Sequence, residues 1–341
     1  MRHFLLCRLP NGCHDRRTEL ESSQTLQSFV FYERERGRIT PERRISRYHI
    51  ALKPAHTILA QACVSVLLQL GDDDGLGDVD KSGPPAIYSA QYWVRHAQFE
   101  DVVSCIKGLE YLFDPDKSYF GAWRRLYDID IQPRDGNVFY YLNPRSTVGD
   151  NTSLYYAALC GFLNLAEQLM IKYPQHVNAI GGYCMTPAVA ALAERHFELA
   201  EVLHRNGSSV EPRGISDYTP LHFAALYGDL EMVQVLLEFG VDVDRPNKYG
   251  TTPLNYASGK GHRNSAMVVR LLIERGADPN ARDVFGFAPL HQASVYGRIE
   301  IARVLVEHGA NVEAKNDSGM TPLDVARGDE MRNSPLERSA K

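Results

Sequence analysis

The pattern of apolar and polar positions in the second half of the chain predicts pairs of short helices. In residues 219–240 a proline follows Thr219, and a narrow apolar face formed by a leucine and two alanines follows the proline. Gly228 ends this first helix, and a second helix with regularly spaced Leu and Val residues stops at Gly240. The polar segment 241–250 then ends in a turn signal. We therefore expect a helix-turn-helix unit followed by a hairpin.

This unit recurs along the chain. Related heptapeptides begin at six positions with intervals of 34, 33, 33, 36 and 33 residues, namely Thr152, Thr186, Thr219, Thr252, Ala288 and Thr321. Self-similarity at a near-constant period is the signature of a solenoid, in which each unit buries its apolar face against its neighbours. Such a chain is suited to presenting an extended surface.

The heptapeptide Thr219-Pro220-Leu221-His222-Phe223-Ala224-Ala225 resembles the signature of the ankyrin repeat. The resemblance implies an all-α ankyrin-repeat solenoid over residues 151–330, with hairpin fingers and five full repeats followed by a partial one. The copy at Thr186 departs from the pattern, with Val189 in the histidine place and Arg195 where glycine is usual. After Gly328 no apolar second helix follows, so either the final helix pair is half-made or the chain stops early.

One repeat, between Thr252 and Gly276, carries three extra residues. We assign them to positions 263–265, between its two helices, where a longer loop is tolerated at little entropic cost.

A small helical domain is expected ahead of the solenoid, at residues 46–130. Its motifs Ala55-His56, Tyr92-Trp93, Ala122-Trp123 and Tyr127-Asp128-Ile129-Asp130 are similar to the helical segment that joins the NTPase module to the repeats in fungal NACHT/ankyrin proteins. The resemblance assigns residues 1–45 to the tail of an NTPase-associated winged-helix part. A connecting loop is expected at residues 131–150 and a polar tail at 331–341.

Composition and charge narrow the function classes. The net charge of −5 argues against nucleic acid as the main partner, although residues 1–70 hold eleven Lys or Arg against six Asp or Glu. No apolar run approaches the length of a membrane span, and the apolar start is too short for a signal peptide, so we expect a cytoplasmic protein, with the nucleus also open to it. Six scattered cysteines without a Cys-x-x-Cys pair indicate neither a metal site nor disulfides.

No catalytic or cofactor motif is expected. The string at residues 75–82 places Asp80 at the sixth position, where a phosphate-binding loop needs glycine, and it lies in an acidic stretch. His222 and His291 belong to the repeat motif, where we expect their rings to bond backbone and threonine groups. We therefore expect no enzyme, no cofactor and no metal.

The chain is thus interpreted as a scaffold that binds a protein partner, with no nucleic-acid or membrane partner and an open oligomeric state. The first hypothesis is the recognition arm of a NACHT/ankyrin-type signalling protein that lacks its NTPase module. The alternative is a stand-alone regulator or adaptor whose residues 1–150 form a separate effector or enzyme domain. The ankyrin frame implies a concave partner-binding surface at the finger tips and inner helix faces, formed by Tyr183, Ser216, Tyr218, Leu226, Tyr227, Tyr249, Thr251, Lys260, Phe285, Phe287, Val295 and Tyr296.

Overall fold

The computed structural model describes residues 52–69, 83–99, 102–129 and 152–327. The expectations for residues 1–45, 131–150 and 331–341, and for the acidic string at 75–82, lie outside the described residues. Within these ranges the chain folds into α-helices and short 3-10 helices, and the one β feature there is an isolated bridge between Gly181 and Met185. The predicted all-α class is confirmed. The chain divides into two compact units, residues 1–129 and residues 130–341.

The first unit is a small helical domain with an aromatic core. Trp93 and Trp123 meet edge to face with ring centroids 5.2 Å apart, and the Trp123 indole N–H donates to the Ala90 carbonyl oxygen at 3.0 Å. Both indoles are fully buried, and such pairing adds to the stability that area burial alone provides. The described helices of this unit are α2 (Leu52–Gln69), α3 (Gly83–Ala97), η2 (Val102–Cys105), α4 (Leu109–Leu112) and α5 (Tyr119–Leu126).

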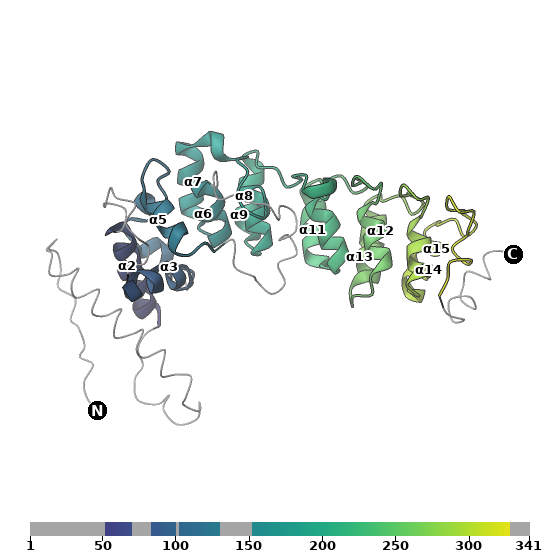
Figure 1. Ribbon diagram of the computed structural model, residues 1–341, viewed down its shortest axis with the longest axis horizontal. Coiled ribbons are helices and arrows are strands. Elements are labelled where there is room, and N and C mark those ends of the chain that lie inside the picture. The colour runs from purple at the N-terminus through teal and green to yellow at the C-terminus, as the bar shows by residue number, and fades with distance from the viewer. Residues whose placement is uncertain (1–51, 70–82, 100–101, 130–151, 328–341) are drawn as a thin grey trace, which may run out of the picture. The chain divides into compact units, whose positions relative to one another are not determined.

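In its described residues, 152–327, the second unit is a row of five helix pairs with hairpin fingers between successive pairs (Figure 1). We number the repeats one to six from their starts at Thr152, Thr186, Thr219, Thr252, Ala288 and Thr321. The inner helices, first in each pair, are α6 (Ser153–Cys160), α8 (Pro187–Ala193), α10 (Pro220–Tyr227), α12 (Pro253–Gly259) and α14 (Pro289–Val295). The outer helices are α7 (Leu163–Lys172), α9 (Phe197–Arg205), α11 (Leu230–Glu238), α13 (Ser265–Glu274) and α15 (Ile299–Glu307). Two 3-10 turns, η4 (Pro174–His176) and η5 (Ile215–Asp217), lie between pairs.

The inner helices begin where the repeated heptapeptide predicts. Each starts directly after its repeat's first residue, and four of the five have proline in the first turn, where the missing N–H would be unpaired. The Thr186 hydroxyl caps α8 by accepting from the backbone N–H of Val189 at 3.3 Å. The first-turn prolines, together with the hydroxyl cap of α8, therefore mark where these inner helices begin.

Small and branched apolar residues form the core between repeats. Ala224 and Ala225 of α10 are fully buried, and their size lets neighbouring helices approach closely. Leu236 of α11 and Leu305 of α15 are also completely buried. Repeat stacking supplies the hydrophobic core that a single helix pair lacks.

Two details of the repeats refine the sequence interpretation. The extra residues of repeat four form the exposed loop 260–264, so the assignment to 263–265 was wrong in one respect: Ser265 is the first, buried residue of α13. In repeat six, residues 321–326 form a single turn, held by a hydrogen bond of 3.2 Å from the Val325 N–H to the Thr321 carbonyl oxygen. Residues after 327, where a second helix of this repeat would follow, lie outside the described ranges, so the partial sixth repeat stays a prediction.

Among the described segments, no helix combines the length and the apolar character needed to cross a membrane.

Candidate functional site

The fingers between the last repeats share one hydrogen-bonded turn. The side-chain oxygen of Asn247 accepts from the backbone N–H groups of Tyr249 and Thr251, at 2.9 and 3.1 Å. Asp283 and Asn316 repeat this arrangement in the next two fingers, with distances of 2.9 to 3.0 Å. A short polar side chain at this place therefore holds each finger tip in a single conformation.

Successive fingers are also joined to one another through their backbones. The Ser216 carbonyl oxygen accepts from the N–H of Lys248 at 3.0 Å, and that of Tyr249 accepts from Val284 at 3.0 Å. The Phe285 carbonyl oxygen accepts in turn from Asp317 at 3.1 Å. The predicted tip residues Ser216, Tyr249 and Phe285 thus form one continuous row.

The side chains of this row face solvent. Tyr249 is 43% exposed and Phe285 is 65% exposed, while Ser216 is half-buried. Val284 and Met320 extend the exposed apolar row, at 54% and 38%, and the sequence analysis missed both. Val284 directly precedes the marked Phe285, and Met320 directly precedes Thr321 and so holds the place that Tyr218, Thr251 and Phe287 hold in the earlier repeats.

Three predicted residues lie two positions beyond the tips and are half-buried: Tyr218, Thr251 and Phe287. The Tyr218 hydroxyl lies 2.5 Å from that of Tyr256, a half-buried residue of α12 that the sequence analysis did not single out. Burial and this hydrogen bond raise the pKa of Tyr218. These side chains line the surface between the fingers and the inner helices, and each is only partly accessible to solvent.

The other predicted residues of repeats three to five lie at the carboxyl ends of inner helices. Tyr227, Lys260 and Tyr296 are exposed, and Leu226 and Val295 are half-buried. The Tyr296 ring lies against Gly259 of the preceding repeat, where an added Cβ would lie only 3.2 Å from it. An inner helix of about eight residues is about 12 Å long, so this helix-end group is separated from the fingers by roughly that distance.

The first finger differs from the later ones. Tyr183 is half-buried in the turn closed by the bridge between Gly181 and Met185, and Met185 has a positive φ of 66°. Ser216 and Asp217 also adopt positive φ, at 60° and 61°, within η5. The predicted surface is therefore most regular from Tyr249 onward. None of the twelve predicted residues is buried.

The motif histidines connect one repeat to the next. His222 Nδ1 accepts from the Thr219 N–H at 3.1 Å, and His291 Nδ1 accepts from Ala288 at 3.2 Å. His291 Nε2 donates to the Met320 carbonyl oxygen at 3.1 Å. Burial lowers the pKa of His222 to about 4 and lowers that of His291. Both rings are neutral structural donors and acceptors, as their place in the motif predicts.

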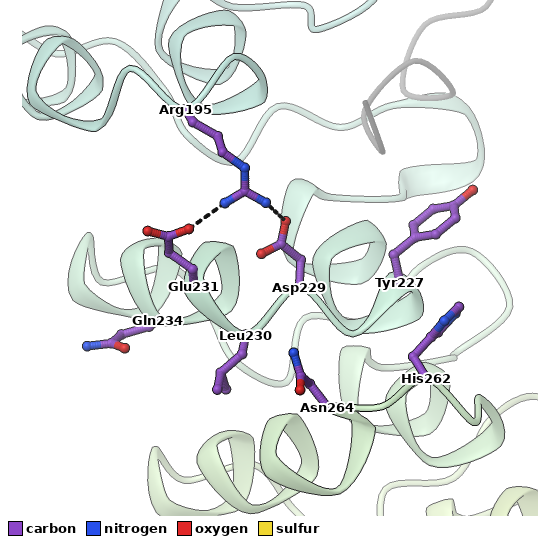
Figure 2. Close-up of a pocket in the computed structure, with 8 residues that line it drawn as sticks. All are labelled: Arg195, Tyr227, Asp229, Leu230, Glu231, Gln234, His262 and Asn264. Atoms are coloured by element: carbon purple, nitrogen blue, oxygen red, sulfur yellow. Dashed lines mark hydrogen bonds and ion pairs between the residues drawn. The ribbon is translucent and has the colours of Figure 1, made fainter. Parts of the chain in front are cut away.

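A hollow of about 790 Å³ lies at the turns between inner and outer helices of repeats two to four (Figure 2). Arg195 reaches across it and donates to Asp229 at 2.7 Å and to Glu231 at 2.5 Å. Tyr227 and His262 line the other side, with ring centroids 6.3 Å apart. The sequence analysis noted Arg195 only as a departure from glycine and missed its partners.

Arg195 adopts a backbone conformation that usually requires glycine. Its φ is 63°, against 77° for Gly161, 69° for Gly228 and 65° for Gly297 at the equivalent place. A non-glycine residue there is strained by about 1–2 kcal/mol. The bridge to Asp229 and Glu231 is the interaction that glycine would lose.

In the ranges that the structure describes, no group of three or more His, Cys, Asp or Glu side chains is placed to hold a metal ion.

Comparison with known proteins agrees with this architecture. The family described as ankyrin repeats (3 copies) matches residues 187–283 and 263–331. The second unit therefore contains ankyrin repeats. The mouse ankyrin repeat and SAM domain-containing protein 6 is 32% identical over 134 residues, covering 37% of this chain and 15% of the relative.

Two fungal relatives match a similar fraction of the chain. The probable 26S proteasome regulatory subunit p28 of Saccharomyces cerevisiae is 33% identical over 120 residues, covering 35% of this chain and 53% of that protein. The ankyrin repeat protein nuc-2 of Neurospora crassa is 25% identical over 143 residues, covering 32% and 13%. The matched part of the chain spans between about an eighth and about half of these relatives.

Proposed function

We propose that the chain is a protein-binding scaffold whose partner lies on the surface formed by the finger row and the inner helix ends. The observation that carries the proposal is the exposure of Tyr249 and Phe285 on adjacent fingers whose backbones are hydrogen-bonded to each other. Aromatic side chains bury a large area at little entropic cost, which makes them frequent hot spots. Rigid fingers further reduce the entropy lost on binding.

The partner surface comprises the twelve residues named from the sequence, together with Tyr256, Val284 and Met320. Tyr227, Tyr249, Phe285 and Tyr296 are its exposed aromatic members. The half-buried Tyr218 and Phe287 lie between them and support the rings that a partner would contact. Residues of the outer helices are outside this surface.

We further propose that this scaffold is the recognition arm of a NACHT/ankyrin-type signalling protein. The proposal is supported by the motif residues of the first unit, because Trp93 and Trp123 form its core and His56 contacts His96 across α2 and α3, with 2.9 Å between their Nδ1 atoms. The full reading frame of the transcript tests it. An in-frame phosphate-binding loop upstream of residue 1 supports the proposal, whereas an untranslated leader there favours the stand-alone regulator.

Capture of a partner by the full chain, followed by amide hydrogen exchange on the complex, tests the scaffold proposal. Exchange should slow in fingers 245–251 and 281–287 and in α10, α12 and α14. Exchange in α11, α13 and α15 should be unchanged and serves as the internal control. Protection confined to the outer helices would contradict the proposed surface.

A further inference from the structure

The turns between the inner and outer helices of repeats four and five, together with the end of the described part of repeat six, carry four cationic side chains. Lys260, Arg263 and Arg327 are exposed, and Arg298 is half-buried. Within the part of the chain that the structure describes, none of the four forms an ion pair. We refer to Lys260, Arg263, Arg298 and Arg327 as the basic strip.

Contacts between successive turns make this strip continuous. The Arg298 guanidinium lies over Gly261, in the space that a side chain at 261 would occupy. The Arg327 backbone N–H donates to the Ser294 carbonyl oxygen at 3.3 Å, which places repeat six against repeat five. The glycine at position 261 thus admits the cation of the next repeat.

Carboxylates near the strip are engaged with other groups. Asp229 and Glu231 bind Arg195, and Glu300 pairs with Arg303 at 3.5 Å. Asp324 accepts from the backbone N–H and the hydroxyl of Thr321, each at 2.8 Å. None of these carboxylates forms an ion pair with a side chain of the strip in the described part of the chain.

Exposed aromatic rings lie along the same turns. Tyr227 precedes the strip at 39% exposure, and Tyr296 lies within it at 55% exposure. Together with Lys260 between them, these rings offer apolar contacts beside charged ones. This combination suits a ligand that carries both carboxylates and apolar side chains.

We propose that the basic strip binds an extended acidic peptide segment of the partner, a proposal that rests on the scaffold function above. Packed helices lie about 8–10 Å apart, and an extended chain advances about 3.3 Å per residue. Acidic side chains about three residues apart would therefore meet successive repeats. Intervening apolar side chains contact Tyr227 and Tyr296.

An acidic peptide fits the strip better than a nucleic acid does. The strip spans only three repeats, and Glu231, Glu300 and Asp324 flank it. A long polyanion that ran past these carboxylates would be repelled, and the chain as a whole carries a net charge of −5. A short peptide avoids that repulsion.

A peptide array tests the inference on the full chain. The probes are fluorescein-labelled peptides of a dozen residues, built from Glu, Leu, Tyr and Ser, with Glu at different spacings. A second array replaces each Glu by Lys, and a single-stranded oligodeoxynucleotide of similar length is the third probe. Affinities are measured by fluorescence anisotropy at an ionic strength of about 0.15 M.

The test variant is Lys260→Glu combined with Arg327→Glu, and the matched control is Arg205→Glu combined with Arg275→Glu. All four positions are exposed, and the two double variants change the net charge equally. Unfolding curves of both variants are measured to check that each one folds.

We expect Glu peptides with spacing near three to bind best, and the test variant to weaken them at least tenfold while the control variant does not. Lys peptides should bind the test variant better than the original chain. Failure of every Glu peptide to bind, equal binding to the test variant, or tighter binding of the oligonucleotide would overturn the inference.

The captured partner separates this inference from the scaffold proposal. One outcome separates them: the double variant Tyr249→Ala with Phe285→Ala loses the partner, but the double variant Lys260→Glu with Arg327→Glu binds it fully. That outcome would leave the scaffold proposal standing and contradict the acidic-peptide inference. Full binding by both variants would remove both.

Discussion

His222 Nε2 donates a hydrogen bond to the Thr251 carbonyl oxygen, 3.1 Å away, and so connects repeat three to the finger that precedes repeat four. The same ring accepts from the Thr219 N–H through Nδ1 at 3.1 Å. Both bonds together require the neutral ring with its proton on Nε2. Protonation of Nδ1 would place a donor against a donor inside the core.

We predict that acid destabilises the solenoid partly through His222. Its pKa is about 4 in the fold, mainly because burial disfavours the charged ring, against 6.5 for the ordinary group. The unfolded chain binds a proton at His222 at a higher pH than the folded chain does. The free energy of unfolding is therefore undiminished above pH 6.5 and falls as the pH falls towards 4. The loss is on the order of 3 kcal/mol, measurable by urea unfolding across that pH range.

Asn255 suggests the matched control for this prediction, the variant His222→Asn. It occupies the histidine place in repeat four, where Oδ1 accepts from the Thr252 N–H at 3.0 Å and Nδ2 donates to the Phe287 carbonyl oxygen at 3.4 Å. An amide can thus make equivalent bonds without titrating. His222→Asn should flatten the pH dependence between 6.5 and 4 relative to the original chain. An unchanged slope would mean that His222 is not the titrating group.

Truncation of core leucines should destabilise the repeats strongly. Leu236 and Leu305 are fully buried in outer helices, so Leu236→Ala or Leu305→Ala should lower the free energy of unfolding by about 2–5 kcal/mol. Met267→Ala, at a 57% exposed position of α13, should change it by less than about 0.5 kcal/mol. Denaturant unfolding measures all three. A loss below about 1 kcal/mol for both leucines would contradict the described packing.

Two small replacements of Arg195 should differ in stability. Arg195→Gly removes about 1–2 kcal/mol of backbone strain along with the exposed ion pairs to Asp229 and Glu231, which contribute about 0–1 kcal/mol each. Arg195→Ala loses the ion pairs but keeps the strain. The glycine variant should therefore be the more stable of the two by about 1 kcal/mol in thermal or urea unfolding. Greater stability of the alanine variant would show that the backbone at 195 relaxes out of its positive φ.

Local chemistry made much of the solenoid predictable. The Thr-Pro start of repeats such as Thr219-Pro220 sets an N-cap and a favourable first turn, and glycines such as Gly228 allow the positive φ that ends a helix. The loop in repeat four was misplaced at Ser265 because serine favours the N-cap, whereas here Asn264 holds that place and Ser265 is the first residue of α13.

Contacts between repeats were the part that sequence patterns left undetermined. The Tyr218–Tyr256 pair and the bridge from Arg195 to Asp229 join residues 38 and 34 positions apart. Each depends on the side-chain conformation and on the relative placement of two units, which a single repeat does not encode. The predicted surface residues stay a prediction, although the structure leaves all of them at least partly accessible.

The affinity of a triple variant for the captured partner tests the proposed binding surface most directly. Tyr227, Tyr249 and Tyr296, each exposed by 39% to 55%, are changed to alanine in the full chain. The control changes Tyr111, Ile171 and Met267, which are exposed at positions outside the surface. We expect unchanged helical circular dichroism for both variants and at least a tenfold loss of affinity, about 1.4 kcal/mol, for the tyrosine variant alone. Full affinity of the tyrosine variant with intact helicity would contradict the account.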